Sequence, residues 1–227
     1  MPSRPVPQTI ACPRCGHEDT VTVWDTLDSE ESPTAFAQLI DGSLFQHECS
    51  ECGAVALLNY PCLFQDPVHR VMVYYIADDS TVSDVEKMFG DIERERERSG
   101  DPYKTHMRIV RSINTLREKA TAFDDELDDR VVELVKAVFM VYASAADEME
   151  GERVDEVYYS GLDDDGNLIM YMVGPKEKNT GTVPLAFYEK LEDDFLFGHG
   201  VPDDSYYIDY EWAIHWIDES GILSQEE

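Results

Sequence analysis

The sequence predicts an α+β protein with a β-rich N-terminal part, central helices and a smaller, acidic α+β C-terminal part. Three observations lead to this prediction. Runs of β-branched and aromatic residues occur in the first third of the chain, and apolar residues recur at helical spacing in the middle. Residues 147–227 then hold 22 acidic side chains and 4 basic ones. Hydrophobic residues make up 43% of the 227 residues, which is enough to build a packed core.

The β-rich part is predicted from four short runs that β-branched and aromatic side chains dominate. Turn-forming residues separate these runs, at Asp41-Gly42, at Gly53 and over residues 61–67. We therefore expect four short strands, of which the last two are buried. The predicted strands are residues 20–27, 44–47, 55–60 and 71–76.

Three helices are predicted for the central segment. The first begins at a capping box formed by Ser83 and Glu86 and ends near Gly100. The second covers residues 103–122, with Met107, Val110, Ile113 and Leu116 pointing inward. The third follows Asp125 and carries a broad apolar stripe, which indicates core packing rather than a cofactor pocket. The residues of this stripe are Leu127, Val131, Leu134, Val135, Val138, Phe139 and Tyr142.

Residues 144–155 are rich in small and acidic side chains, and we interpret them as the linker to the C-terminal part. A hairpin is predicted beyond it, because two strand-like runs flank the acidic turn 163–167. This turn does not match a calcium loop, since Leu168 and Gly174 stand where an EF-hand has its glycine and glutamate. The remaining predicted elements are hairpin strands over 157–162 and 168–173, a helix over 184–197, a short strand over 206–208 and a last helix capped by Asp209.

Four of the five cysteines form two C-x-x-C motifs, each followed by glycine: residues 12–16 and residues 49–53. Such a turn directs two thiolates to one side of a tight loop, and the glycine tolerates the backbone conformation that the turn demands. Two such turns supply four thiolates in the closed, tetrahedral arrangement of a structural zinc site. We therefore predict a zinc-ribbon-like domain with one structural Zn²⁺ ion. Its predicted ligands are Cys12, Cys15, Cys49 and Cys52.

Other interpretations of the two motifs stay open, namely a redox-active C-x-x-C pair and reduced thiols in the core. His17 and His47 lie next to the motifs and are candidates to replace a thiolate. A catalytic zinc ion is disfavoured, because four thiolates leave no position for water and because the chain contains neither H-E-x-x-H nor the deaminase signature. The fifth cysteine, Cys62, is interpreted as a buried apolar residue.

The residues that flank the two C-x-x-C motifs show a resemblance to a known protein family. Residues 44–48 precede the second motif and residues 58–63 follow it, and together with the motifs they resemble the CpXC family of bacteria and archaea. Similarity extends to residues 108–114 and 123–132. Ser50 stands where the family name implies proline, which leaves the four cysteines intact. The resemblance implies zinc binding and a cytoplasmic protein, and it supplies no reaction.

The expected organisation is a CpXC zinc-binding domain with its helical segment over residues 8–143 and an acidic α+β region over residues 154–223. The formal net charge of −30 disfavours nucleic acid as a partner, because such binding relies on lysine and arginine contacts to phosphates. No run approaches the ~20 apolar residues of a membrane span, and residues 1–7 lack the apolar core of a secretory signal. We expect a cytoplasmic, non-catalytic, zinc-stabilised protein-interaction or regulatory module with a protein partner.

Two alternatives are kept. The first is nucleic-acid binding through a local basic helix over residues 103–122, with Lys104, Arg108 and Arg111 along one side; the competing interpretation is that these groups neutralise the protein's own carboxylates. The second is an enzyme of unidentified class, with His199 between two glycines and His215 near tryptophans as candidate acid–base groups. No nucleophile elbow, P-loop or dinucleotide-binding motif supports this second alternative.

Overall fold

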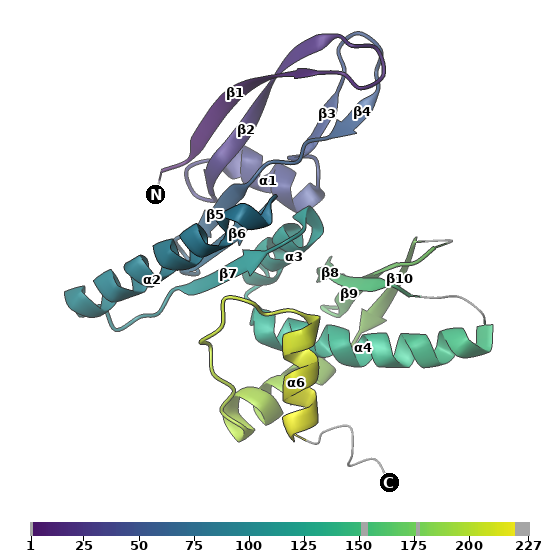
Figure 1. The fold of residues 1–227 in the computed structure, drawn as a ribbon. Coiled ribbons are helices and arrows are strands. Elements are labelled where there is room, and N and C mark those ends of the chain that lie inside the picture. Colours follow the sequence, from purple (N-terminus) through teal and green to yellow (C-terminus); the bar gives the residue numbers. More distant parts are fainter. Residues whose placement is uncertain (1, 151–153, 176–177, 221–227) are drawn as a thin grey trace. The chain divides into compact units, whose positions relative to one another are not determined.

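The computed structural model describes residues 2–150, 154–175 and 178–220 and shows the predicted mixture of helices and strands (Figure 1). The chain divides into two compact units, Met1–Ala120 and Thr121–Glu227. The helix α3, Ile113–Asp124, crosses the boundary between them. The expected domain bounds, 8–143 and 154–223, stay a prediction, and residues 221–223 of the second lie outside the described part.

The first unit is built on a mixed five-stranded sheet with the order β1-β2-β5-β6-β7. Neighbouring strands are antiparallel between β1 and β2 and between β5 and β6, and parallel between β2 and β5 and between β6 and β7. A separate two-stranded ribbon is formed by β3 and β4. The elements are β1 (Arg4–Ala11), β2 (Glu18–Asp28), α1 (Pro33–Asp41), β3 (Gln46–Glu48), β4 (Val55–Leu57), β5 (Cys62–Asp66), β6 (Val71–Tyr75), a 3₁₀ turn (Asp79–Thr81), α2 (Val82–Ser99) and β7 (His106–Val110).

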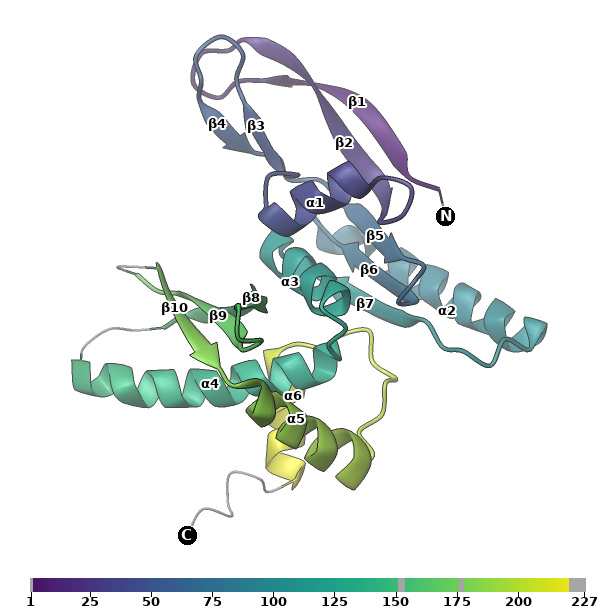
Figure 2. The ribbon, with the colours of Figure 1, turned by 180° about the vertical axis from the view of Figure 1, so that it is seen from behind.

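The long strand β2 connects two parts of the first unit. Most of its length pairs with β1 in an extended hairpin, and its end, Thr26–Asp28, pairs in parallel with β5. Figures 1 and 2 show the β3–β4 ribbon beside the far end of this hairpin. The core lies at the other end, where Leu27, Phe64 and Val73 are fully buried and the ring of Phe36 from α1 stacks on Phe64 at 5.5 Å. The two ribbons therefore extend from a packed body.

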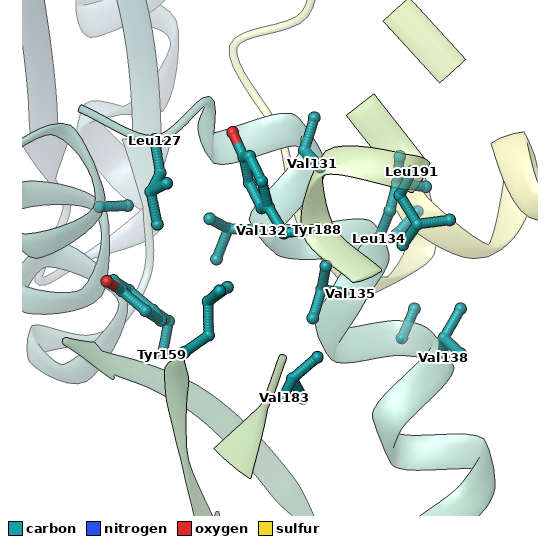
Figure 3. Packing of buried hydrophobic residues seen from close by; sticks show 14 of the residues in the cluster. Leu127, Val131, Val132, Leu134, Val135, Val138, Tyr159, Val183, Tyr188 and Leu191 are labelled. Carbon is teal, nitrogen blue, oxygen red and sulfur yellow. The ribbon is translucent and has the colours of Figure 1, made fainter. Parts of the chain in front are cut away.

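The second unit is organised around α4, Asp129–Glu150. The three-stranded antiparallel sheet, in the order β10-β9-β8, lies on one side of α4, and α5 and α6 lie on the other (Figures 1 and 2). Buried residues of α4, among them Val131 and Val135, meet Tyr159 and Tyr188 in one hydrophobic cluster (Figure 3). The other elements are β8 (Glu156–Leu162), β9 (Leu168–Val173), β10 (Lys178–Val183), α5 (Leu185–Glu192), a π-helical turn (Asp193–Gly198) and α6 (Tyr210–Ser220).

Several predicted elements of the second unit are confirmed. The acidic turn joins β8 and β9 as a hairpin, and the Asp163 carboxylate accepts hydrogen bonds from the backbone N–H groups of Asp165 and Asn167. Asp209 caps α6, since its carboxylate accepts the N–H of Trp212 at 3.0 Å. The predicted apolar stripe is buried from Leu127 to Val138, partly buried at Phe139 and 58% exposed at Tyr142.

The helix predicted over residues 103–122 is wrong. Residues His106–Val110 form β7, which pairs in parallel with β6, and α3 begins only at Ile113. Ser112 marks this start, because its hydroxyl accepts the N–H of Thr115 at 3.0 Å. Apolar residues three positions apart fit a helix, yet a short apolar run fits a buried strand equally well.

Three further expectations for the first unit are wrong. The run 55–60, expected as a buried strand, forms only the short strand β4, and Val55 and Leu57 are exposed because within the described residues this strand pairs with β3 alone. The turn expected over residues 61–67 contains β5, a central strand that is buried along its whole length, because its prolines stand only at the flanks. The capping box of Ser83 and Glu86 does not begin α2. The chain instead enters that helix through the preceding 3₁₀ turn, where the Asp78 carboxylate accepts the N–H of Ser80.

The remaining differences concern the linker and short elements. Residues 144–150 of the expected linker continue α4, and residues 151–153 lie outside the described part. Residues 206–208 form no strand, because a turn forms there in which the Ser205 hydroxyl accepts the N–H of Tyr207. Besides β5 and β7, the elements that were not expected are β1, α1 and β10. Two prolines in β1 conceal it in the sequence, although an edge strand tolerates them.

Candidate metal centre

The two C-x-x-C motifs form the turns of two β-hairpins. Residues 12–16 lie in the turn between β1 and β2, and residues 49–53 lie in the turn between β3 and β4. The two turns have matching hydrogen bonds: Gly16 N–H donates to the Cys12 carbonyl and Gly53 N–H donates to the Cys49 carbonyl, both at 2.9 Å. Both glycines have a positive φ, +76° and +66°, as the turn requires.

The hairpins bring the four predicted ligands together. Their sulfur atoms all lie within 4.8 Å of one another. The Sγ atoms of Cys12 and Cys52 are 3.7 Å apart, and so are those of Cys15 and Cys49. A tetrahedron with zinc–sulfur bonds of about 2.3 Å has edges of about 3.8 Å. The donor set and its spacing therefore fit a single thiophilic metal ion.

The thiols of the cluster differ in pKa. Backbone N–H groups of Cys15 and Arg14 donate to Cys12 and lower the pKa of its thiol to about 6. At Cys15 the backbone N–H of His17 also lowers the pKa, but burial and the neighbouring thiols outweigh it and raise the pKa to about 12. Four thiolates this close repel one another without a cation between them, and a bound metal ion supplies the compensating charge.

A carboxylate outside the cluster joins the two hairpins. Asp19, at the start of β2, accepts hydrogen bonds from the Ser50 hydroxyl at 2.5 Å and from the Ser50 N–H at 3.2 Å. His47 Nε2 lies 2.9 Å from the same carboxylate. These contacts with Ser50 and His47 hold the pKa of Asp19 well below its usual range. The contacts fix the second motif against the hairpin that carries the first.

The structure places the other candidate residues outside the cluster. His17 and His47 do not join the four sulfurs, because both rings lie against Asp19, with His17 Nε2 at 3.6 Å from it. Cys62 is confirmed as buried, and burial raises the pKa of its thiol to about 12. His199 is exposed after the π-helical turn, and His215 is exposed beside the ring of Trp216.

The basic residues of the nucleic-acid alternative form no common helical face. Arg108 and Lys119 are each 1% exposed. Arg111 pairs with the carboxylate of Asp79. The helical face on which that alternative depended is therefore not formed, because His106–Val110 is a strand.

Sequence reasoning missed Asp19 and Ser50. The only local sign is the run His17-Glu18-Asp19 directly after the first motif. The partner of Asp19 lies 31 positions away in the chain, and only the pairing of the hairpins brings the two together.

A mixed α+β fold with four cysteines on two hairpin turns defines a zinc-ribbon-like protein whose cysteines are placed for a metal ion. A family model described as CpXC protein matches residues 10–136, more than half of the chain, and the chain belongs to the CpXC family. Neither a curated protein nor a solved structure matches the chain. Within the described ranges, no helix is long and apolar enough to cross a membrane.

Proposed function

We propose that the protein is a non-catalytic, zinc-stabilised interaction module in which Cys12, Cys15, Cys49 and Cys52 bind one structural zinc ion. The observation that carries the proposal is the cluster of four sulfur atoms within 4.8 Å. Four thiolates saturate a tetrahedral ion and leave no open position for substrate or water. A reducing, cytoplasmic environment keeps such thiols available for metal.

The hairpins that hold the cluster lack a core of their own. No residue of β1, β3 or β4 is buried, and in the part of β2 that pairs with β1 only Val21 and Val23 are. Ribbons of this kind gain little from hydrophobic burial, so the free energy of metal binding becomes free energy of folding. A zinc ion would supply one cross-link between the two turns, and Asp19 would orient the second turn toward it.

Chelation combined with hydrogen exchange tests the structural role. Removal of the metal by a strong chelator should abolish the protection of backbone amides in the two turns, residues 12–16 and 49–53, because the turns then lose their link. Amides of α4 in the second unit provide an internal control, since their protection rests on the hydrophobic cluster. Complete removal of the metal with unchanged protection in both turns would contradict the proposal.

A further inference from the structure

The strand β4 has one edge without a partner. β3 pairs with its inner edge, and no strand of the described residues pairs with the outer one. Both views show β4 on the side of β3 that faces away from β1 and β2 (Figures 1 and 2). β4 is therefore the outer strand of the ribbon that the second C-x-x-C motif closes.

Backbone groups on this edge point outward. Cys49 N–H donates to the Ala54 carbonyl, and Leu58 N–H donates to the Phe45 carbonyl, which fixes the hydrogen-bonded pairs of the β3–β4 ladder. Bonded and non-bonded pairs alternate in an antiparallel ladder. The N–H and C=O groups of Val55 and Leu57 therefore face the free edge, and nothing in the described part of the chain hydrogen-bonds to them there.

Side chains on the same strand are apolar and exposed. Val55 is 64% exposed and Leu57 is 67% exposed. Both lie on one face of the ribbon, since side chains two positions apart share a face. The opposite face carries His47, which the contact with Asp19 holds in place. The ribbon thus presents the two apolar side chains and the free backbone edge to solvent together.

The charge around β4 indicates which kind of segment can bind to its free edge. The ribbon segments 10–19 and 44–58 contain four carboxylates and one arginine. Glu48 is exposed and stands directly across from Val55, on the face of the apolar side chains. Asp19 contacts His47 on the opposite face, so both faces of the ribbon carry a carboxylate. A second copy of this chain would bring identical carboxylates together between two bodies of charge −30. A cationic segment complements the same surface.

We propose that β4 binds an extended segment of a protein partner in which apolar residues alternate with lysine or arginine, added as a third strand of the ribbon. This inference rests on the proposed function and names its partner class. Main-chain hydrogen bonds to Val55 and Leu57 provide the affinity, and the apolar and acidic side chains provide the selectivity. The second motif leads directly into β4, so the metal that closes this turn also fixes the edge.

Hydrogen exchange of the full, metal-loaded chain with a synthetic peptide tests the inference. The probe is a seven-residue peptide of alternating lysine and valine. It should slow exchange of the Val55 and Leu57 amides by about tenfold or more, because these amides become donors to the added strand. A peptide with glutamate in place of lysine, and one N-methylated along one edge, should leave both rates unchanged. Unchanged rates with the lysine peptide at millimolar concentration overturn the inference.

Matched variants separate this surface from the metal site. The double variant Val55→Ser, Leu57→Ser removes the apolar side chains without adding charge, and it should weaken peptide binding by about tenfold or more and keep its metal content. Val68→Ser is the control, because Val68 is equally exposed (64%) and lies outside the ribbon. Equal binding by the double variant overturns the inference, as does a wild-type dimer in sedimentation that this variant abolishes. Metal content measured on the same samples reports on the proposed function separately.

Discussion

Among single side chains, Asp19 connects the two hairpins that carry the four cysteines. Its carboxylate contacts Ser50 within the second motif and His47 just before it, while the residue itself follows the first motif. Partners of this kind, one step removed from the ligands, orient the turns and are commonly worth a factor of about 10–100 in metal affinity.

Replacement of Asp19 by alanine should therefore weaken zinc binding by about 10- to 100-fold. The second motif then loses its hydrogen bonds to the β1–β2 hairpin, although all four cysteines remain. Competition with a chromophoric chelator measures the affinity. Asp25→Ala serves as the matched control, because Asp25 lies on the same strand and pairs with Arg4 at an exposed position away from the second motif. Equal affinities of the two variants would show that Asp19 does not position the site.

Local signals set the beginning of α6. Asp209 accepts the N–H of Trp212 with its side chain and the N–H of Ala213 with its carbonyl. The helix then buries Ala213 and Ile217 in the cluster of the second unit. A polar side chain at this position satisfies a donor that the helix itself cannot satisfy.

Asp209→Ala should lower the free energy of unfolding of the second unit by about 1 kcal/mol. Asp209→Asn should change it much less, because asparagine also accepts the Trp212 N–H. Urea denaturation followed by tryptophan fluorescence compares the three proteins, since Trp212 and Trp216 both lie in α6. A difference between alanine and asparagine that falls within error would argue against the cap.

Elements with a local signal were predictable from the sequence. The β8–β9 hairpin and α6 each contain a turn or cap that a single stretch of chain determines. β5 was assigned to a turn and β7 to a helix, because their parallel pairing with β2 and β6 comes from distant parts of the chain. The period of an apolar run does not decide between a short helix and a buried strand; the neighbouring strands decide.

The candidate site was also predictable in part, where a single stretch of chain determines its structure. Each cysteine pair and its glycine form one tight turn, so the sequence indicated all four sulfur positions. The role of Asp19 was not predictable, because it depends on how two hairpins pack. His17 and His47 looked like ligands by their position in sequence, and the fold turns both toward this carboxylate instead.

At the scale of the whole molecule, acidic and basic residues are distributed unevenly between the two units. Residues 1–120 contain 20 acidic and 12 basic side chains, whereas residues 121–227 contain 28 and 6. In α2, Arg94, Arg96 and Arg98 all pair with carboxylates of the same helix. The second unit has its own hydrophobic cluster, while the ribbons of the first unit carry the four cysteines in their turns. Loss of metal should therefore affect one unit and spare the other.

Native mass spectrometry of the purified protein tests the central claim most directly. The wild-type chain and the Cys62→Ala variant should each carry one zinc ion, because Cys62 is buried away from the cluster. Cys49→Ser should lose the ion, since three thiolates no longer close the tetrahedron. A wild-type chain that is folded and free of metal, or a Cys49→Ser variant that keeps a full equivalent of zinc, would contradict the account.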